Sequence, residues 1–160
     1  MPDYIDHDFP CRTAHIEYAQ DVENKLSSIH LDTWSPYTRH VLLSVELNDL
    51  RAGDLLIISS EHQVTNDTGI NLQNSSLMIL GESAKATVGD IVIQPKGYNI
   101  DQQMHHGIIT HSRTYRVSKS YAKVYLNLVV YAASDIAKPT HTLRYDRGQS
   151  HLDVIVVKID

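Results

Sequence analysis

Apolar side chains occupy every second position of residues 121–132. The even-numbered positions are all apolar: Ala122, Val124, Leu126, Leu128, Val130 and Ala132. The odd-numbered positions are half polar and rich in tyrosine: Tyr121, Lys123, Tyr125, Asn127, Val129 and Tyr131. Because successive side chains of a strand point to opposite faces, this pattern predicts one long central strand with one face in the core. The tyrosine-rich face is too aromatic for ordinary solvent exposure and too polar for a core, so we expect it to meet a partner. A second sheet or helix of the same chain is an equally good candidate to cover it.

Other alternating segments and short apolar runs follow the same rule and are separated by turn residues. They predict strands at residues 12–18, 37–47, 55–64, 77–80, 91–94, 108–117, 142–145 and 152–159. Pro95, Lys96 and Gly97 predict a turn that ends the strand at 91–94. About nine short strands, spaced about 8 to 12 residues apart, are typical of an all-β sandwich or barrel.

Two segments carry further information about the topology. Val22, Leu26 and Ile29 fall at helical spacing and favour a short helical turn, although residues 27–31 are equally compatible with an extended strand. The segment 152–159 is apolar on both faces. A strand of that kind is usually central, so we expect the last strand to lie in the middle of a sheet.

The chain length of 160 residues predicts a single domain with a real core. Residues 1–10 are charged, contain Pro2 and Pro10 and show no periodicity. We therefore expect a flexible N-terminal arm at 1–10, which would dock on a neighbour, and one β-sandwich domain at 11–160.

Composition narrows the classes of partner. The net charge of −5 argues against general binding of nucleic acid, which depends on clustered basic side chains. The nearest approach to a basic stripe is Arg113, Arg116, Lys119 and Lys123. A single cysteine, Cys11, excludes an intrachain disulfide, so stability must come from packing or assembly.

The sequence carries no pattern of a membrane or secretory protein. No apolar run approaches the roughly 20 residues that a membrane span needs. The first eight residues are acidic where a signal peptide would be basic and then apolar. We therefore expect synthesis in a cytosol without a signal peptide, and location in a virion if the protein is viral.

Motifs for phosphate binding, nucleophilic catalysis and zinc binding are missing from the sequence. Ten histidines suggest a metal, and the densest group is His105, His106 and His111, which His62 would join only from elsewhere in the chain. On a strand, neighbouring residues and residues five apart point to opposite faces, so the spacing does not bring these ligands together. We predict ordinary surface or hydrogen-bonded histidines, no metal and no cofactor.

The residues Gly89, Pro95 and Gly97 match the opening of the second cupin box, G-x5-P-x-G, and cupins are jelly rolls. Ile100 stands where that box has its histidine ligand. In the segment that resembles the first box, Ser59 and Glu61 replace the two histidines, and Asn66 lies near the position of the expected glutamate. A metal-binding cupin is therefore excluded, and a cupin-like enzyme without the usual ligands remains the second alternative.

The tyrosine-bearing segment 121–132 and the terminal segment 152–159 resemble the tumour-necrosis-factor-like jelly rolls. The resemblance covers residues 37–160 and lies in pattern and length. It implies a jelly-roll type of β-sandwich, in which three copies pack around an axis through aromatic residues of inner strands. Carried over to this chain, the interface residues are Tyr121, Tyr125 and Tyr131. A chain of this kind is also similar to the modules that tailed bacteriophages use as capsid decorations or fibre heads.

We predict a non-enzymatic, self-associating and trimeric virion structural protein, whose partners are copies of itself and a capsid shell. The alternative is a carbohydrate-binding, lectin-like module, because aromatic rings stack on sugars and polar side chains hydrogen-bond to them. The residues predicted to bind a surface glycan are Tyr98, Asn99, Asp101, His105 and His106.

Overall fold

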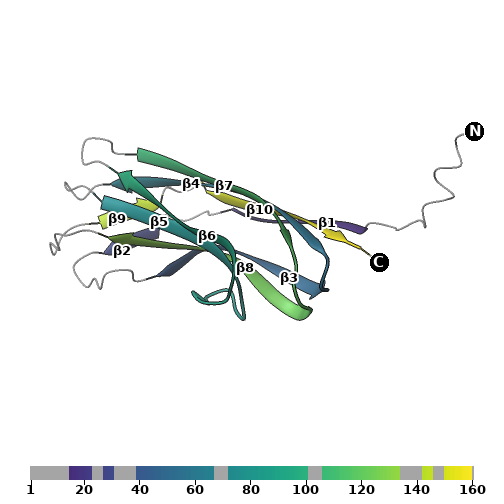
Figure 1. Ribbon diagram of the computed structural model, residues 1–160. Coiled ribbons are helices and arrows are strands. Elements are labelled where there is room, and N and C mark those ends of the chain that lie inside the picture. The colour runs from purple at the N-terminus through teal and green to yellow at the C-terminus, as the bar shows by residue number, and fades with distance from the viewer. Residues whose placement is uncertain are drawn as a thin grey trace, which may run out of the picture.

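The computed structural model describes residues 15–22, 27–30, 39–66, 72–100, 106–133, 142–145 and 150–159. These residues form ten strands, which pair antiparallel in two sheets (Figure 1). The prediction of an all-β, antiparallel β-sandwich is confirmed. The strands are β1 (His15–Val22), β2 (Ser27–His30), β3 (His40–Leu50), β4 (Leu55–Asn66), β5 (Leu72–Gly81), β6 (Asp90–Ile100), β7 (His106–Arg116), β8 (Tyr121–Ala133), β9 (Thr142–Tyr145) and β10 (His151–Lys158).

The larger sheet has six strands arranged around β4. One edge of β4 pairs first with β10 and then with β9, while its other edge pairs with β7. Strand β1 extends this sheet beyond β10, and β2 extends it beyond β9. The terminal strand β10 thus lies between β1 and β4, as the apolar residues on both of its faces predicted.

The smaller sheet has the strand order β3-β8-β5-β6. Strand β8 pairs with β3 on one side and β5 on the other, so the predicted long central strand is confirmed. Along the chain, β3, β5, β6 and β8 belong to this sheet, whereas β4 and β7 belong to the larger one. The chain therefore crosses repeatedly between the two sheets.

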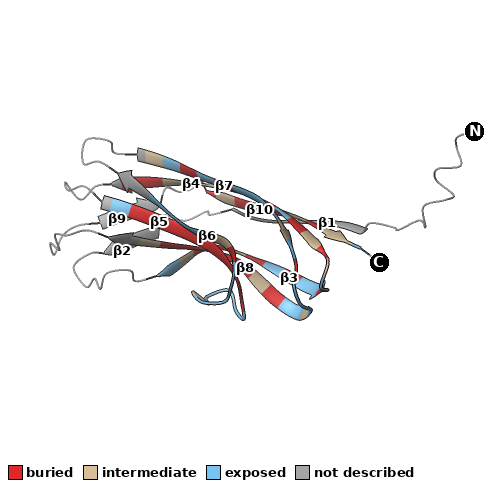
Figure 2. Cartoon of the chain, viewed as in Figure 1, coloured by how far each residue is buried: buried red, intermediate tan, exposed pale blue. Residues whose placement is uncertain are grey.

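The main core lies between the sheets, where the buried positions of both meet (Figure 2). Strand β8 contributes Val124, Leu126, Leu128 and Val130, which are the predicted core positions of its even-numbered face. Ala122, predicted to share this face, is exposed near the start of the strand. Each fully buried aliphatic side chain contributes roughly 1.5–3 kcal/mol by leaving water. This row of residues is a main reason why the two sheets stay together.

The predicted turn at Pro95, Lys96 and Gly97 is wrong, because β6 continues through it to Ile100. Strand β6 is an edge strand of the smaller sheet. It pairs only with β5, so the other edge of its backbone forms no ladder hydrogen bonds with a described strand. The register shifts between Ser76 and Met78, opposite residues 94 and 95. Proline is tolerated at such an edge and bulge, where its missing amide breaks no ladder hydrogen bond.

Two further predictions need correction. Strand β5 runs from Leu72 to Gly81 and not only through 77–80, because β6 and β8 both supply backbone partners to its polar first half. Of the two alternatives for residues 27–31, the helical turn is wrong for residues 27–30 and the extended strand is confirmed there, because these residues form β2 and pair with β9. Pairing between strands overrides a weak local helical spacing.

Candidate functional site

The odd-numbered positions of β8 carry all three tyrosines predicted to lie in an interface. Tyr131 packs on the outer face of the smaller sheet, whereas Tyr121, at the start of the strand, packs against the main core. Tyr121, Tyr125 and Tyr131 are half-buried in the isolated chain, whereas Lys123 is exposed. Because β8 is central, side chains of β3 and β5 share this outer face with it. The site is therefore built from three strands that the sequence separates widely.

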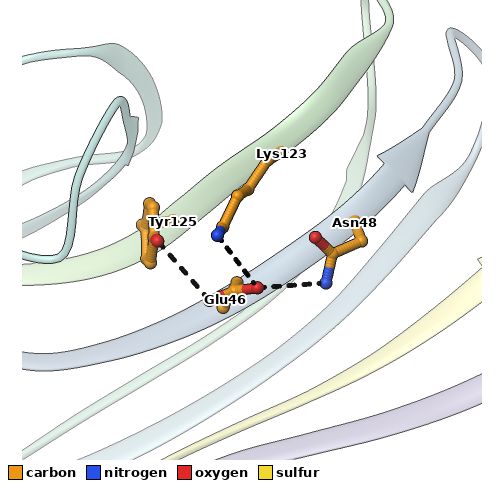
Figure 3. Close-up of polar contacts among 4 residues, drawn as sticks. All are labelled: Glu46, Asn48, Lys123 and Tyr125. Carbon is orange, nitrogen blue, oxygen red and sulfur yellow. Dashed lines mark hydrogen bonds and ion pairs between the residues drawn. The ribbon is translucent and has the colours of Figure 1, made fainter.

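Glu46 organises the polar contacts around Tyr125 (Figure 3). The two residues are directly opposite in the pairing of β3 with β8, and the Tyr125 hydroxyl donates to Glu46 Oε2 at 3.4 Å. Asn48 Nδ2 donates to Glu46 Oε1 at 3.4 Å, and Lys123 Nζ lies 3.6 Å from the same oxygen. The charge of Glu46, and then Tyr125, raises the pKa of Lys123, which stays cationic at neutral pH.

A second cluster with the same composition surrounds Tyr121. The Tyr121 hydroxyl donates to Asp90 Oδ2, and Lys119 Nζ lies 3.1 Å from the same oxygen. Burial, followed by the hydrogen bond to Asp90, raises the pKa of Tyr121, so its hydroxyl keeps its proton. The hydrogen bonds from Tyr121 and Lys119 lower the pKa of Asp90, which favours its ionised form.

The two clusters repeat one arrangement along the chain. Lys119 Nζ is 5.3 Å from the centre of the Tyr121 ring, and Lys123 Nζ is 5.9 Å from the centre of the Tyr125 ring. In each cluster a lysine precedes its tyrosine by two residues, and a carboxylate accepts from both. Each lysine–tyrosine–acid cluster is therefore neutral overall and presents an aromatic ring beside a cation.

An open pocket of about 860 Å³ adjoins the cluster around Tyr121. Its lining includes Asp90, Lys119 and Tyr121 on the polar side and Leu80 and Val88 on the apolar side. Val88 is 71% exposed and stands at this pocket as an apolar side chain without cover from the described residues. The pocket thus extends the tyrosine surface toward the connection between β5 and β6.

That connection, residues 82–89, covers the middle of the tyrosine face. Asn127 lies beneath it and is fully buried, with Nδ2 donating to the carbonyl oxygens of Ser83 and Ala86, each at 2.9 Å. Ser44 Oγ donates to Asn127 Oδ1 at 2.6 Å. For Asn127, the alternative that the same chain covers this face is therefore correct.

Tyr131 lies on the other side of this covered region and has a different environment. It packs against a small outer cluster formed by Leu77, Ile79 and Val129. The guanidinium carbon of Arg39 is 5.7 Å from the centre of the Tyr131 ring, and Arg39 Nη1 donates to the Thr87 carbonyl at 3.4 Å. The three tyrosines thus form two separate patches rather than one continuous face, and their role in an interface stays a prediction.

The structure brings together two histidines that the spacing alone did not pair. His62 of β4 is fully buried and His111 of β7 is 6% exposed, and their ring centres are 6.3 Å apart. Ser76 Oγ lies 2.6 Å from His111 Nε2. The prediction of ordinary histidines missed this burial, although His62 falls on the same alternate positions as Leu56 and Ile58.

The predicted glycan-binding residues cannot be placed as a site. Asp101 and His105 lie outside the described residues, and the side chains of Tyr98, Asn99 and His106 are not described although their backbones belong to β6 and β7. Within the described ranges, no three His, Cys, Asp or Glu side chains gather as a group able to hold a metal ion. Among those same residues, no helix has the length and apolar character to cross a membrane.

No protein-family model matches this chain, and no curated protein matches its sequence. Solved structures are similar to it in fold. In the crystal structure of the T13 viral particle of infectious bursal disease virus, one chain is 10% identical with a TM-score of 0.53, covering 89% of this chain and 31% of that one. In the structure of the Gx strain of the same virus, the identity is 9% and the TM-score 0.51, covering 91% and 38%.

This chain thus spans about a third of the length of those two viral chains. Tailspike protein 4 of bacteriophage CBA120 is 14% identical, but its TM-score of 0.32 over 86% of this chain and 19% of that one is too low to indicate a shared fold. The predicted likeness to viral β-structured proteins is confirmed at the level of the fold. The likeness to tumour-necrosis-factor-like modules stays a prediction.

Proposed function

We propose that this chain is a non-enzymatic, self-associating structural protein of a virion, such as a capsid decoration or a fibre-head module. The observation that carries the proposal is the fold shared over 89% of the chain with a protein of a viral particle. A fold alone does not determine function, so the proposal also needs a contact surface. The outer face of β8 supplies a candidate.

The two lysine–tyrosine–acid clusters have the composition of a protein–protein contact. Tyrosine is enriched at the residues that carry most binding energy, because its ring buries a large area at a small entropic cost. The hydrogen bond from the Tyr125 hydroxyl to Glu46 is long and exposed, at 3.4 Å, and the ion pair of Lys123 with Glu46 beside it is exposed as well, at 3.6 Å, so both contribute little to folding. Its ring is consequently available to a neighbouring subunit.

We propose three subunits around a closed axis, because cyclic symmetry repeats each contact and leaves no unpaired copy of the surface. The strand order supports a jelly-roll type of sandwich for this subunit, since the chain crosses between the two sheets repeatedly from β2 to β9. Residues 1–10 would bind the capsid shell or a neighbouring subunit.

Mass in solution, measured by light scattering on the full chain, tests the proposal. We expect three times the 18.1 kDa of one chain. A mass of 18.1 kDa at every protein concentration up to about 1 mM, a range that detects even weak contacts, would contradict self-association. A stable dimer would retain self-association and exclude the trimer.

A further inference from the structure

The interior of the sandwich contains a group of polar side chains in a region where the neighbouring inward positions are aliphatic. His62 and Ser60 belong to β4, His111 to β7 and Ser76 to β5, and all four are buried. In the pairing of β4 with β7, Ser60 lies opposite His111. Because Ser76 comes from the smaller sheet and contacts His111 Nε2 at 2.6 Å, the group spans both sheets.

The two imidazoles lie close enough for their charges to interact strongly. Their rings are stacked with an angle of 20° between the planes and 6.3 Å between the centres. Two cations at this distance repel each other far more in a dry core than in water, because the effective dielectric constant is lower there. This arrangement therefore disfavours a proton on both rings at once.

The surroundings also disfavour a proton on either ring. Burial, and then the neighbouring His111, lowers the pKa of His62 to about 3. Burial, and then the positive charge of Lys96 on β6, lowers the pKa of His111. The nearby carboxylates, Glu61 on β4 and Asp153 on β10, are each within ion-pair distance of His151, at 3.6 and 2.8 Å.

These influences on the two rings all act in one direction. Burial penalises a cation at both positions, and a proton on one ring repels a proton on the other. Lys96 has the wrong sign to stabilise a further positive charge on His111. Protons taken up by the pair would therefore destabilise the sandwich as long as it is closed.

We propose that the His62–His111 pair is an acid-operated switch. At neutral pH the pair holds the two sheets together. In mild acid both rings take up protons, and the sheets separate where β4 and β7 face β5. The inference rests on the buried pair and not on the proposed function. If the protein is a virion subunit, the same device makes its fold sensitive to an acidic compartment. Acid lowers the stability because histidine in the unfolded chain has a pKa of about 6.5, above the lowered pKa of both rings in the folded chain.

The expected pH window follows by linkage. Above about pH 6.5 the rings are neutral in both the folded and the unfolded chain, and stability is at its full value. Below about pH 6.5 the histidines bind protons in the unfolded chain but not in the folded chain, so the free energy of unfolding decreases as the pH falls toward about 3. The unfolding equilibrium constant should rise about tenfold per pH unit for a ring that stays neutral in the folded chain, which for His62 is about 100-fold between pH 6.5 and 4.5, and the lowered pKa of His111 adds to this rise.

Urea unfolding of the full chain at pH 7.5 and 4.5 tests this, with His62→Gln/His111→Gln as the variant and His40→Gln, at an exposed position of β3, as the control. The wild type and the control should lose the same stability between the two pH values. In the double variant, the rise of the unfolding equilibrium constant between pH 7.5 and 4.5 should be at least 100-fold smaller than in the wild type. An equal loss in all three proteins would overturn the proposal.

A second measurement needs no folded variant. In the wild-type protein, the nuclear magnetic resonance signals of the His62 ring should not titrate between pH 8 and 5 while the fold persists, and the His111 ring should titrate below the ordinary histidine pKa. If both rings take up protons with midpoints near 6.5 in the folded protein, the switch does not exist. Hydrogen exchange should also show that amides of β4 and β7 open at pH 5 before those of β3 and β8.

Discussion

Tyr125 and Glu46 are directly opposite each other in the antiparallel pairing of β8 with β3, and the tyrosine hydroxyl donates to the carboxylate at 3.4 Å. Such an exposed, long contact orients the ring without fixing it strongly. The ring can therefore keep this direction while one of its faces packs against another subunit. This relationship makes Tyr125 the most direct test of the proposed assembly.

We expect Tyr125→Asp to reduce the mass in solution to that of one chain, because a carboxylate would be buried in the contact beside Glu46. Tyr125→Phe should keep the assembled mass, since it retains the ring and loses only a weak hydrogen bond. Light scattering at matched concentrations measures both. Thr114→Asp, at an exposed position of β7 in the other sheet, is the control. An unchanged mass for Tyr125→Asp would exclude this strand from the interface.

Asn127→Ala should lower the free energy of unfolding by about 2–3 kcal/mol, because two backbone carbonyls and the Ser44 hydroxyl lose a buried partner. Urea unfolding followed by fluorescence measures the change. Asn48→Ala is the matched control, since Asn48 is exposed and the one described hydrogen bond of its side chain is 3.4 Å long. Its effect should be below about 0.5 kcal/mol. Similar losses in both variants would mean that residues 82–89 are not anchored by Asn127.

Gly89→Ala should destabilise the connection between β5 and β6, because a Cβ atom there would overlap the backbone carbonyl of Leu80. Backbone cannot move aside as a flexible side chain does, so we expect a loss of about 1–3 kcal/mol. Thermal unfolding should show a lower midpoint. Ala84→Ser, which also adds one heavy atom but at an exposed position of the same connection, should leave the midpoint nearly unchanged. A midpoint for Gly89→Ala equal to that of the wild type would contradict the close approach.

Tyr121 should ionise at higher pH than an ordinary tyrosine, because burial and then Asp90 raise its pKa. A raised folded pKa means that the associated stability is complete below the unfolded value of about 10 and is lost as the pH rises above it. Absorbance at 295 nm should therefore reveal one late-titrating phenol. Asp90→Asn should shift that phenol to lower pH, and the absence of any shift would exclude Asp90 as a cause.

Alternation of apolar residues was sufficient to predict β8, the position of β10 and most of the main core, because a strand with one buried face needs period two. The same rule failed where polar residues occupy buried positions. Asn74, Ser75 and Ser76 are buried in β5, although their polarity placed them outside the predicted strand. His62 continues the buried alternate positions of β4, but its polarity suggested the surface.

The site was predictable only in part for a different physical reason. Tyr125 and Tyr131 lie on the predicted face, whereas Tyr121 packs against the main core. The partners Glu46 and Asp90 come from strands placed beside β8 by pairing and by the connection at 82–89. No local pattern records which distant segment folds back over a strand. The division of the tyrosine face into two patches is therefore a property of the tertiary structure.

Strand β6 is an edge of the smaller sheet, and it carries Pro95, which has no amide, beside a register shift in its pairing with β5. An uninterrupted edge strand exposes a row of unpaired backbone amides to other polypeptide chains, and fibrils grow by adding strands to such an edge. Here that row is broken, which discourages the growth of open-ended ribbons. At the β6 edge, a second copy is therefore hindered from adding to the sheet backbone to backbone, and a contact there has to use side chains.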